Sequence, residues 1–272
     1  MTGEVGSIRQ YHDQDIFRVA KLAGFKTYYV DNNRFVNRDP MYMIAKQSDF
    51  YYSLNGIGET VARNDHKIKH DELVLKPFQN ALSLSKGEKR IIFVHLVGSH
   101  FNHDLRYPDN FKIFPSHYDN SIRYTDYIVN ILKNSFMASS RGKPAMVIYV
   151  GDHGVKIPPG CGLGEVPKNE VVNYTNDERF FSNMSPPLAF WLNAEFKHAN
   201  RAKAKLLASA QNLPIDQRFL FWTLSDSIGV SKVNNRNVSD YSLFSKSANY
   251  LPRKNSHGKD IDLLVSHGEI CK

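Results

Sequence analysis

The sequence predicts an α/β protein in which a largely parallel sheet is flanked by helices. Short apolar runs rich in β-branched and aromatic residues, typical of buried strands, are clearest at residues 90–96 and 146–150. Segments with apolar residues at helical spacing lie between the strand candidates, as at residues 14–23 and 118–135. Strands and helices alternate from about residue 14 to residue 192, and this alternation favours parallel strands joined by helical crossovers.

The first half of the chain is expected to form several short elements. Residues 14–23 form a helix that Gly24 ends, and residues 26–31 follow as a strand. The next expected elements are a helix at 41–46, a strand at 49–54, a helix at 73–82 and a strand at 90–96. His70-Asp71-Glu72 is expected to cap the helix at 73–82, in which Pro77 is unfavourable because proline has no backbone N–H. Residues 33–40 and 55–69 are expected to be loops.

The second half is organised around the strand at 146–150. The other expected elements are a long loop at 101–117, a helix at 118–135, a second long loop at 155–185, a strand at 187–192, and helices at 194–211 and 219–228. The tail from residue 231 is polar, with a hairpin expected at 247–265. With no repeat and no convincing linker, residues 1–272 are expected to form one domain, of which 231–272 is a polar C-terminal extension.

Composition narrows the possible partners. A formal charge of +8 and a pI near 9.3 favour anionic partners, but the basic residues are spread along the chain and no nucleic-acid-binding motif is present. We therefore expect no nucleic-acid partner. The two cysteines, Cys161 and Cys271, leave a single disulfide open without requiring it. The first residues lack the apolar core of a signal peptide, and no apolar run approaches ~18 residues, so we expect neither an export signal nor a membrane span in this chain.

The stretch from Met146 to Gly154 carries the strongest candidate site. Its strand ends in Gly151-Asp152-His153-Gly154, which places a carboxylate and an imidazole at the edge where open α/β sheets bind ligands. Oxygen and nitrogen donors on a rigid strand end suit a divalent cation such as zinc. A strand-to-loop turn with a polar pair in solvent is the alternative.

The strand at 90–96 ends in a similar way. Its apolar run is followed by Val97-Gly98-Ser99-His100, so a polar group again follows a glycine at the sheet edge. The loop at 101–117 is rich in His, Asp, Tyr and Pro, and long loops inside compact domains are often functional. Within it, Arg106 and Tyr107 are our candidates for substrate binding. We expect Asp152 and His153 to face the same cleft as His100.

Three segments in this order resemble the catalytic domain of bacterial phosphoethanolamine transferases: HLVGSH at 95–100, YDNSIRYTDYIV at 118–129 and YVGDHG at 149–154. Those enzymes are membrane-anchored members of the alkaline phosphatase and sulfatase superfamily. The resemblance covers roughly residues 14–230 and implies the corresponding α/β fold.

Carried over residue by residue, the resemblance assigns roles to four side chains. Asp152 and His153 match the family's pair of metal ligands, with zinc the expected metal. His100 matches a histidine taken to stabilise the transferring phosphoryl group or to bind substrate. His95 opens the same motif as a second catalytic candidate, although it equally fits a satisfied histidine in the sheet. Asp126 matches strongly too, and we interpret it as scaffold.

The resemblance also implies a reaction and a location. Family members use a threonine to take phosphoethanolamine from phosphatidylethanolamine and pass it to lipid A or a glycan, at the periplasmic face of the inner membrane. A metal lowers the pKa of such a nucleophile and holds the phosphate oxygens, and nearby imidazoles offset the charge that develops in the transition state.

The chain departs from the family pattern where the nucleophile should be. The family's first strand, with an acidic metal ligand, and the threonine after it precede the position matched by residue 14, and Thr2, Glu4 and Ser7 are not in a matching context. Val155 replaces the usual Glu or Gln, PPGCGLGE at 158–165 lacks the later histidine, and Ile215-Asp216-Gln217 replaces His-Asp-Asn. The metal half of the site is present and the nucleophile half is absent.

Three functional hypotheses follow. The first is the C-terminal part of a phosphoethanolamine transferase, inactive alone, whose N-terminal membrane segment and nucleophile are missing or separately encoded. The second is a degenerate, non-catalytic family member that binds an anionic lipid or glycan. The third is a sulfatase or phosphoglycerol transferase of the same superfamily.

Overall fold

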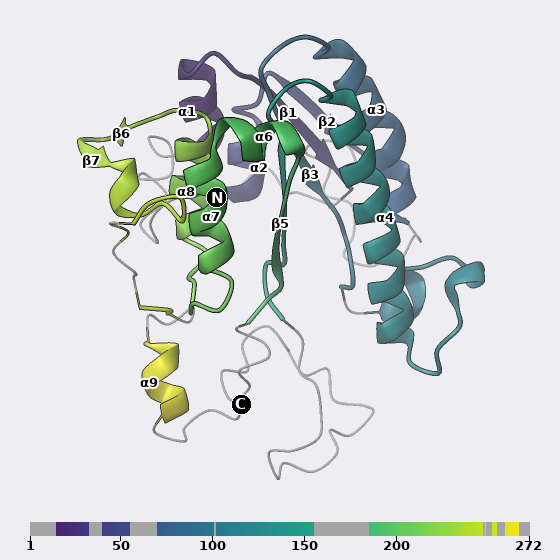
Figure 1. Cartoon of the computed structure of the whole chain (residues 1–272). Coiled ribbons are helices and arrows are strands. Elements are labelled where there is room, and N and C mark those ends of the chain that lie inside the picture. Colours follow the sequence, from purple (N-terminus) through teal and green to yellow (C-terminus); the bar gives the residue numbers. More distant parts are fainter. Residues whose placement is uncertain are drawn as a thin grey trace.

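The computed structural model describes residues 15–32, 40–54, 70–100, 102–154, 185–246, 248, 252–254 and 259–266. Figure 1 shows helices on both sides of a central layer of strands. In chain order, the elements through α4 are α1 (Ile16–Leu22), β1 (Lys26–Asp31), α2 (Pro40–Ala45), β2 (Phe50–Ser53), η1 (Asp71–Val74), α3 (Leu75–Leu84), β3 (Arg90–His95), η2 (His103–Leu105), η3 (Asp109–Phe111) and α4 (His117–Ser139). They are followed by β4 (Met146–Val150), β5 (Leu188–Leu192), α6 (Ala194–Ala199), α7 (Arg201–Ser209), α8 (Phe219–Ser227), β6 (Lys232–Val233), β7 (Arg236–Asn237), η5 (Val238–Asp240) and α9 (Ile261–Ser266).

The fold is α/β, and its larger sheet is parallel, as predicted. Strand β1 lies in the middle of that sheet, in the order β2-β1-β3, and pairs in parallel with both neighbours. Strand β5 pairs with β4 antiparallel, in a separate two-stranded sheet. Strands β3 and β4 both end on the lower side of the molecule in Figure 1, so the loops that follow them leave from the same edge.

Strands β3 and β4 each have a neighbouring strand on one side only, within the described residues. Their apolar sequences, RIIFVH and MVIYV, would suit fully buried strands. Yet every residue of both strands is half-buried, whereas five of the six residues of β1 are buried. The difference follows from position, because β1 has a strand on each side and β3 and β4 do not.

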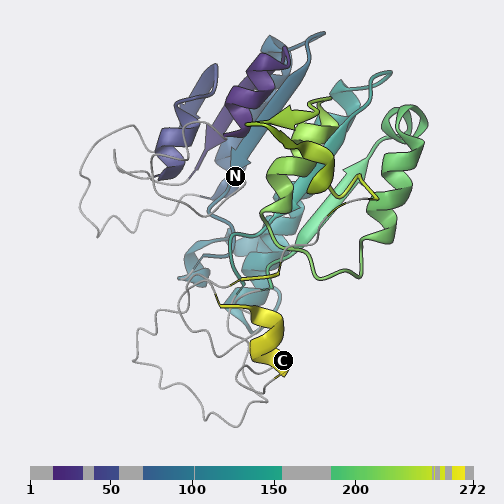
Figure 2. The same ribbon diagram turned by 90° about the vertical axis from the view of Figure 1, so that its left-hand side faces the viewer.

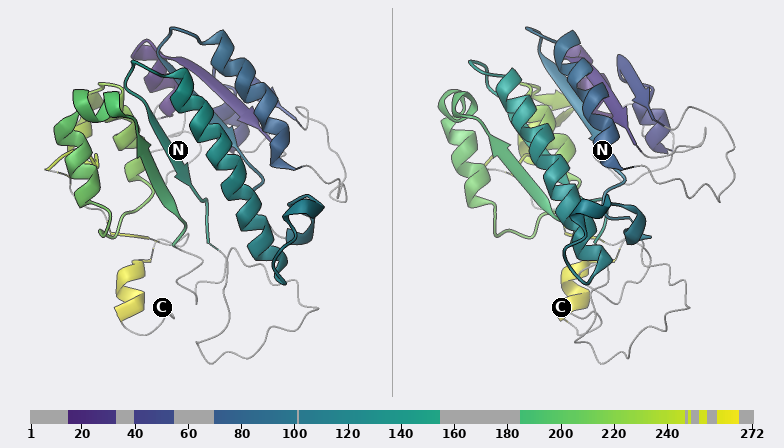
Figure 3. Two further views of the ribbon diagram at one scale, coloured as in Figure 1. Left: turned by 45° about the vertical axis from the view of Figure 1, so that its right-hand side comes forward. Right: turned by 90° about the vertical axis from the view of Figure 1, so that its right-hand side faces the viewer.

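Helices cover both faces of the strands. Helices α3 and α4 lie side by side on one face (Figures 1 and 3), and α1 packs with α8 on the other (Figure 2). The cluster beneath α3 and α4 joins both helices to β1 and β3; its buried members are Val30, Val74, Phe78, Leu82, Tyr107, Tyr124, Ile128 and Leu132. The cluster between α1 and α8 is centred on Phe221 and Trp222, with Ile91 of β3 packed against it.

Local signals explain where the helices begin and end. The Asp15 carboxylate accepts hydrogen bonds from the backbone N–H groups of Phe17 and Arg18, at 2.8 and 3.0 Å, and so caps α1. Ser116 caps α4 through a 3.2 Å bond from the Asp119 N–H. Gly24 follows α1 with φ +78°, the left-handed conformation that glycine adopts most easily.

The structure corrects three sequence predictions. His70 makes no side-chain bond as the cap of η1, so the expected cap there is wrong. The predicted helix at 194–211 is two helices, α6 and α7, that meet at Asn200. In the tail, the segment expected to complete a terminal hairpin instead forms helix α9, after an isolated antiparallel bridge between Lys254 and Asp260, while β6 and β7 form a hairpin that was not predicted. The expected loops at 33–39, 55–69 and 155–184, and both cysteines, lie outside the described residues.

We found no helix within the described ranges that has the length and hydrophobicity to span a bilayer.

The half-buried strands lead to a prediction about self-association. Apolar strands with an unpaired edge recruit other strands, so the purified chain is expected to associate as its concentration rises. Replacing Val147 of β4 with lysine puts a charge on this strand, and the variant is expected to associate less. Sedimentation velocity measures both. A chain that stays monomeric at every concentration, or equal association of both proteins, would contradict this explanation.

Candidate functional site

Gly151 forms the turn that leaves β4, where a side chain would be crowded by two prolines. A Cβ atom at this position would lie 3.1 Å from Pro186 Cβ and 3.1 Å from Pro187 Cδ, closer than ordinary van der Waals contact. The Gly151 N–H donates to the Pro187 carbonyl at 3.0 Å, and the Gly151 carbonyl accepts from Gln217 Nε2 at 2.6 Å. These contacts hold the start of the Asp152-His153 turn against β5 and the residues before α8.

Asp152 and His153 project from this turn as a pair. His153 Nε2 lies 3.7 Å from Asp152 Oδ2, and the side chains are 34% and 87% exposed, respectively. His153 Nδ1 lies 2.7 Å from the Gly154 carbonyl oxygen. Because a carbonyl can only accept, Nδ1 carries a proton. When the ring is neutral, its lone pair is therefore on Nε2, which faces the carboxylate.

This pair fits one side of a metal site. Metal-binding histidines usually donate their second ring N–H to a carbonyl or carboxylate, and His153 does so. The exposed carboxylate of Asp152 offers an oxygen donor beside it. In the part of the chain that the structure describes, no three His, Cys, Asp or Glu side chains gather closely enough to hold one ion. The joint approach of Asp152, His153 and His100 to one ion therefore stays a prediction.

Zinc is expected to bind weakly to the isolated chain. Structural zinc sites with a full ligand set bind with about 10 to 16 kcal/mol, so two ligands supply roughly half of this. That corresponds to a dissociation constant of about 1 μM or weaker. Isothermal titration calorimetry should show this weak binding in the wild type and none in Asp152→Ala. Nanomolar binding would show that the chain has further ligands, with His103 and Glu165 the first to replace.

His95 lies at the end of β3, held by a buried carboxylate. Its Nδ1 is 3.2 Å from Asp31 Oδ1 and 3.4 Å from the Tyr29 hydroxyl. Asp31 is directly opposite His95 in the parallel register of β1 and β3 and has no solvent exposure. When Nδ1 donates to the Asp31 carboxylate, the lone pair of the neutral ring is on Nε2. His95 is thus a partly exposed histidine oriented by an aspartate, a geometry that suits both a catalytic and a structural role.

His100 is exposed at the end of a turn that several side chains hold. The buried Asp71 carboxylate accepts from the N–H groups of Val97 and Gly98, at 2.9 and 2.7 Å. The Ser99 hydroxyl lies 3.4 Å from the Thr125 hydroxyl of α4. Ser99 therefore helps to anchor this turn.

Arg106 and Tyr107, our substrate-binding candidates, lie in different surroundings. Burial lowers the pKa of Arg106, and the nearby carboxylates of Asp71 and Asp104 oppose this effect. Arg106 is therefore a half-buried cation with two acidic neighbours. Tyr107 is only 5% exposed, and its hydroxyl lies 2.6 Å from His117 Nδ1. This burial gives Tyr107 a role in packing the loop on α4. Substrate binding by either residue stays a prediction.

His103 fixes the turn from the η2 side. Its ring bonds to the backbone of Ser99 and His100, while its buried Nδ1 has no partner within the described residues. Protonation would place an N–H at Nδ1 without an acceptor. Burial accordingly lowers the pKa of His103 below its ordinary value of 6.5.

This lowered pKa predicts a pH dependence of stability. Because the unfolded chain binds the proton more readily, the contribution of His103 is fully present above its ordinary pKa and is lost as pH falls toward the lower pKa of the folded state. Between about pH 7.5 and 5.5, a window that brackets the ordinary histidine pKa, wild type should lose more unfolding free energy than His103→Gln. Urea denaturation at both pH values measures the difference, and parallel losses would rule out this role.

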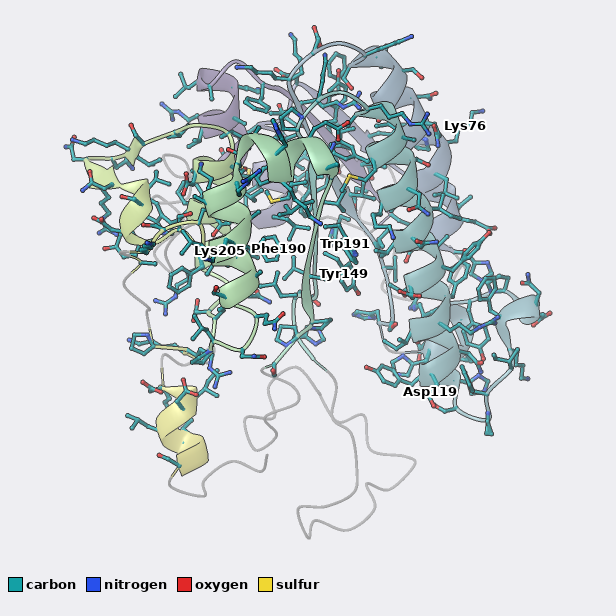
Figure 4. All side chains as sticks on the ribbon, in the orientation of Figure 1. Lys76, Asp119, Tyr149, Phe190, Trp191 and Lys205 are labelled. Carbon is teal, nitrogen blue, oxygen red and sulfur yellow. The ribbon has the colours of Figure 1, made fainter. Side chains whose placement is uncertain are left out.

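Tyr149 lies on β4, close to the end of that strand. Burial raises the pKa of its hydroxyl, and the nearby carboxylates of Asp152, Asp71 and Asp126 raise it further. The Tyr149 hydroxyl therefore lies in the electrostatic field of both Asp152 and the aspartate that binds the His100 turn. Figure 4 shows Tyr149 on β4 and Asp119 at the start of α4, both toward the end of the molecule where these loops leave the sheet.

Three polar residues at this edge were not predicted as part of the site. Asp31 ends β1, Asn32 follows it, and Asp71 begins η1; all three are at most 3% exposed. Asn32 Nδ2 donates to Asp71 Oδ1 at 2.7 Å, and the Asn32 N–H donates to the His95 carbonyl at 2.9 Å. The sequence KTYYVDN at residues 26–32 did indicate Asp31 and Asn32 as candidates. It has the same pattern of an apolar strand followed by polar residues that identified the candidates at 90–100 and 146–153.

Comparisons with known proteins agree with this architecture. The chain is 29% identical over 162 residues to phosphoethanolamine transferase EptC of Escherichia coli K12, covering 52% of this chain and 27% of that protein. It is 26% identical over 186 residues to the Kdo(2)-lipid A phosphoethanolamine 7''-transferase of Salmonella typhimurium, covering 59% of this chain and 30% of that protein. The chain thus spans less than a third of these relatives' lengths.

Solved structures show the same fold. The C-terminal periplasmic domain of Escherichia coli EptC, in complex with Zn, superposes with a TM-score of 0.70 at 22% identity, covering 90% of this chain and 71% of that one. The soluble domain of lipooligosaccharide phosphoethanolamine transferase A from Neisseria meningitidis gives a TM-score of 0.61 at 15% identity, covering 92% and 75%. The Sulfatase family profile matches residues 1–226. With this match over most of its length, the chain belongs to the Sulfatase family.

Proposed function

We propose that this chain is the phosphoryl-binding part of a phosphoethanolamine transferase. The observation that carries the proposal is the Asp152-His153 pair, in which the Gly154 carbonyl holds His153 Nδ1–H and leaves Nε2 beside a carboxylate. The similarity to curated phosphoethanolamine transferases indicates which phosphoryl compound such a site would serve.

Asp152 and His153 would hold a divalent cation, with zinc favoured because a related domain was solved with it. When bound, the cation would supply positive charge to the phosphate oxygens. His100, exposed at the neighbouring strand end, would donate a hydrogen bond to the same phosphoryl group. His95, oriented by Asp31, would hold or accept a proton at Nε2.

The donor in this proposal is phosphatidylethanolamine, and the acceptor is lipid A or a glycan at the periplasmic face of the inner membrane. The relatives' names, one of which specifies a Kdo(2)-lipid A acceptor, support this choice. In this proposal, as in the first hypothesis above, the nucleophile and a membrane segment belong to polypeptide additional to residues 1–272.

Binding of free phosphoethanolamine to the zinc-loaded chain tests the proposal. Calorimetry should detect zinc-dependent binding that His100→Ala weakens by about tenfold, the value of one hydrogen bond to a charged group. Asp152→Ala should abolish this binding, because that variant is expected to bind no zinc. Asp119→Asn changes an exposed carboxylate on α4 and serves as the control. Zinc-independent binding, or binding unaffected by both variants, would contradict the proposal.

A non-catalytic binding protein is the second candidate. It is favoured by Ser99, the one hydroxyl between the two motif histidines, because its side chain lies against Thr125. Both candidates bind phosphoethanolamine, and neither turns over phosphatidylethanolamine alone. Turnover that appears when a polypeptide with the family's nucleophile is added would support the first candidate, and continued inactivity would support the second.

A further inference from the structure

We propose that Asp71 is a positioning residue that holds His100 in place for phosphoryl binding. This inference rests on the proposed function, because it concerns how the same site is built. Asp71 is 3% exposed and lies at the start of η1, far in sequence from the turn that it binds. Its role is separate from metal binding, since it contacts the β3 turn and not the β4 turn.

Three donors converge on the Asp71 carboxylate. Oδ1 accepts from Asn32 Nδ2 at 2.7 Å and from the Val97 N–H at 2.9 Å, and Oδ2 accepts from the Gly98 N–H at 2.7 Å. Two consecutive backbone N–H groups therefore point at one carboxylate. Gly98 has φ +60°, the left-handed conformation that lets its N–H turn toward the same acceptor as its neighbour's.

The bonds between the Asp71 carboxylate and the Val97 and Gly98 N–H groups, which we call the clamp, act on His100 through the backbone of the turn. Asp71 fixes Val97 and Gly98, His103 bonds to the backbone of Ser99 and His100, and together they hold every residue of the turn. His100 itself remains exposed. A turn with a fixed backbone and one exposed imidazole is pre-organised to present that imidazole to a ligand.

Asparagine at position 71 keeps the shape but cannot keep all three bonds. An amide offers one acceptor oxygen, so its NH₂ group would face an N–H of the turn or the Asn32 amide. At least one donor would lose its partner. Gly98→Ala perturbs the same turn from the other side, because open space surrounds the added Cβ while φ +60° remains strained for alanine.

The first test is hydrogen exchange, which does not depend on function. In Asp71→Asn, at least one of the Val97 and Gly98 amides is expected to exchange about tenfold faster or more, relative to the change in core amides. Asp119→Asn, the same chemical change on an exposed carboxylate, should leave them unchanged. Unaltered protection of both amides in Asp71→Asn would overturn the clamp.

The second test is a double-mutant cycle on binding of phosphoethanolamine to the zinc-loaded protein. Asp71→Asn and Gly98→Ala are each expected to weaken binding by about fivefold to tenfold, while zinc affinity stays the same. Adding either change to His100→Ala should cause little further loss, because both act through His100. Full additivity would assign Asp71 a merely structural role and overturn the inference. If His100→Ala alone has no effect, the proposed function fails, and the exchange result still decides the clamp.

Discussion

Purified protein incubated with zinc and a fluorescent phosphatidylethanolamine is expected to release no diacylglycerol above the protein-free background. Transfer through a covalent intermediate needs a hydroxyl held against the metal. Ser99 lies between the two motif histidines, but its hydroxyl is 3.4 Å from the Thr125 hydroxyl and anchors the turn on α4. Loss of a nucleophile lowers turnover by about 10⁴-fold or more.

Asp152→Ala controls for contaminating enzymes. Turnover that survives this substitution comes from another protein. Turnover that Asp152→Ala abolishes would contradict the expectation and show that this chain contains its own nucleophile, and Ser99→Ala would then test the nearest candidate.

Replacing Ile128 with alanine is expected to destabilise the fold by about 2 to 5 kcal/mol, the usual cost of removing a large buried aliphatic side chain. Ile128 has no exposure and packs in the cluster that joins α4 to α3, β1 and β3. Ile122 lies on the same helix and is 43% exposed. Ile122→Ala is therefore a matched control and should cost under about 1 kcal/mol.

Urea denaturation followed by circular dichroism measures both variants. Equal losses would show that α4 does not pack against the larger sheet as described. A small loss for Ile128→Ala alone would mean that the cluster repacks around the cavity.

Local patterns predicted most elements because each carries its own signal. The apolar residues at helical spacing in α1, and Gly24 after them, mark a helix without reference to the rest of the chain. The apolar runs of β3 and β4 likewise mark strands. The candidate site at residues 152 and 153 was visible because glycine and polar residues directly follow such a run.

Features that depend on distant contacts were not readable in this way. The segment PLAFWL contains no signal for strand direction. The antiparallel pairing of β5 with β4 could therefore not be predicted from it. Nothing next to His95 indicates Asp31, which faces it only through strand register. Asp71 looked like a helix cap because the local sequence favours that role, whereas its carboxylate binds a turn formed 26 residues later.

The central claim is that Asp152 and His153 bind a cation that shares a phosphoryl ligand with His100. The most direct measurement is anomalous diffraction at the zinc edge from crystals of this chain soaked with zinc and phosphoethanolamine. We expect an anomalous peak within about 2.2 Å of an Asp152 oxygen and of His153 Nε2, the usual zinc–ligand distance, with the phosphate between the ion and His100. A zinc peak that involves neither residue, or a phosphate bound away from His100, would contradict the claim.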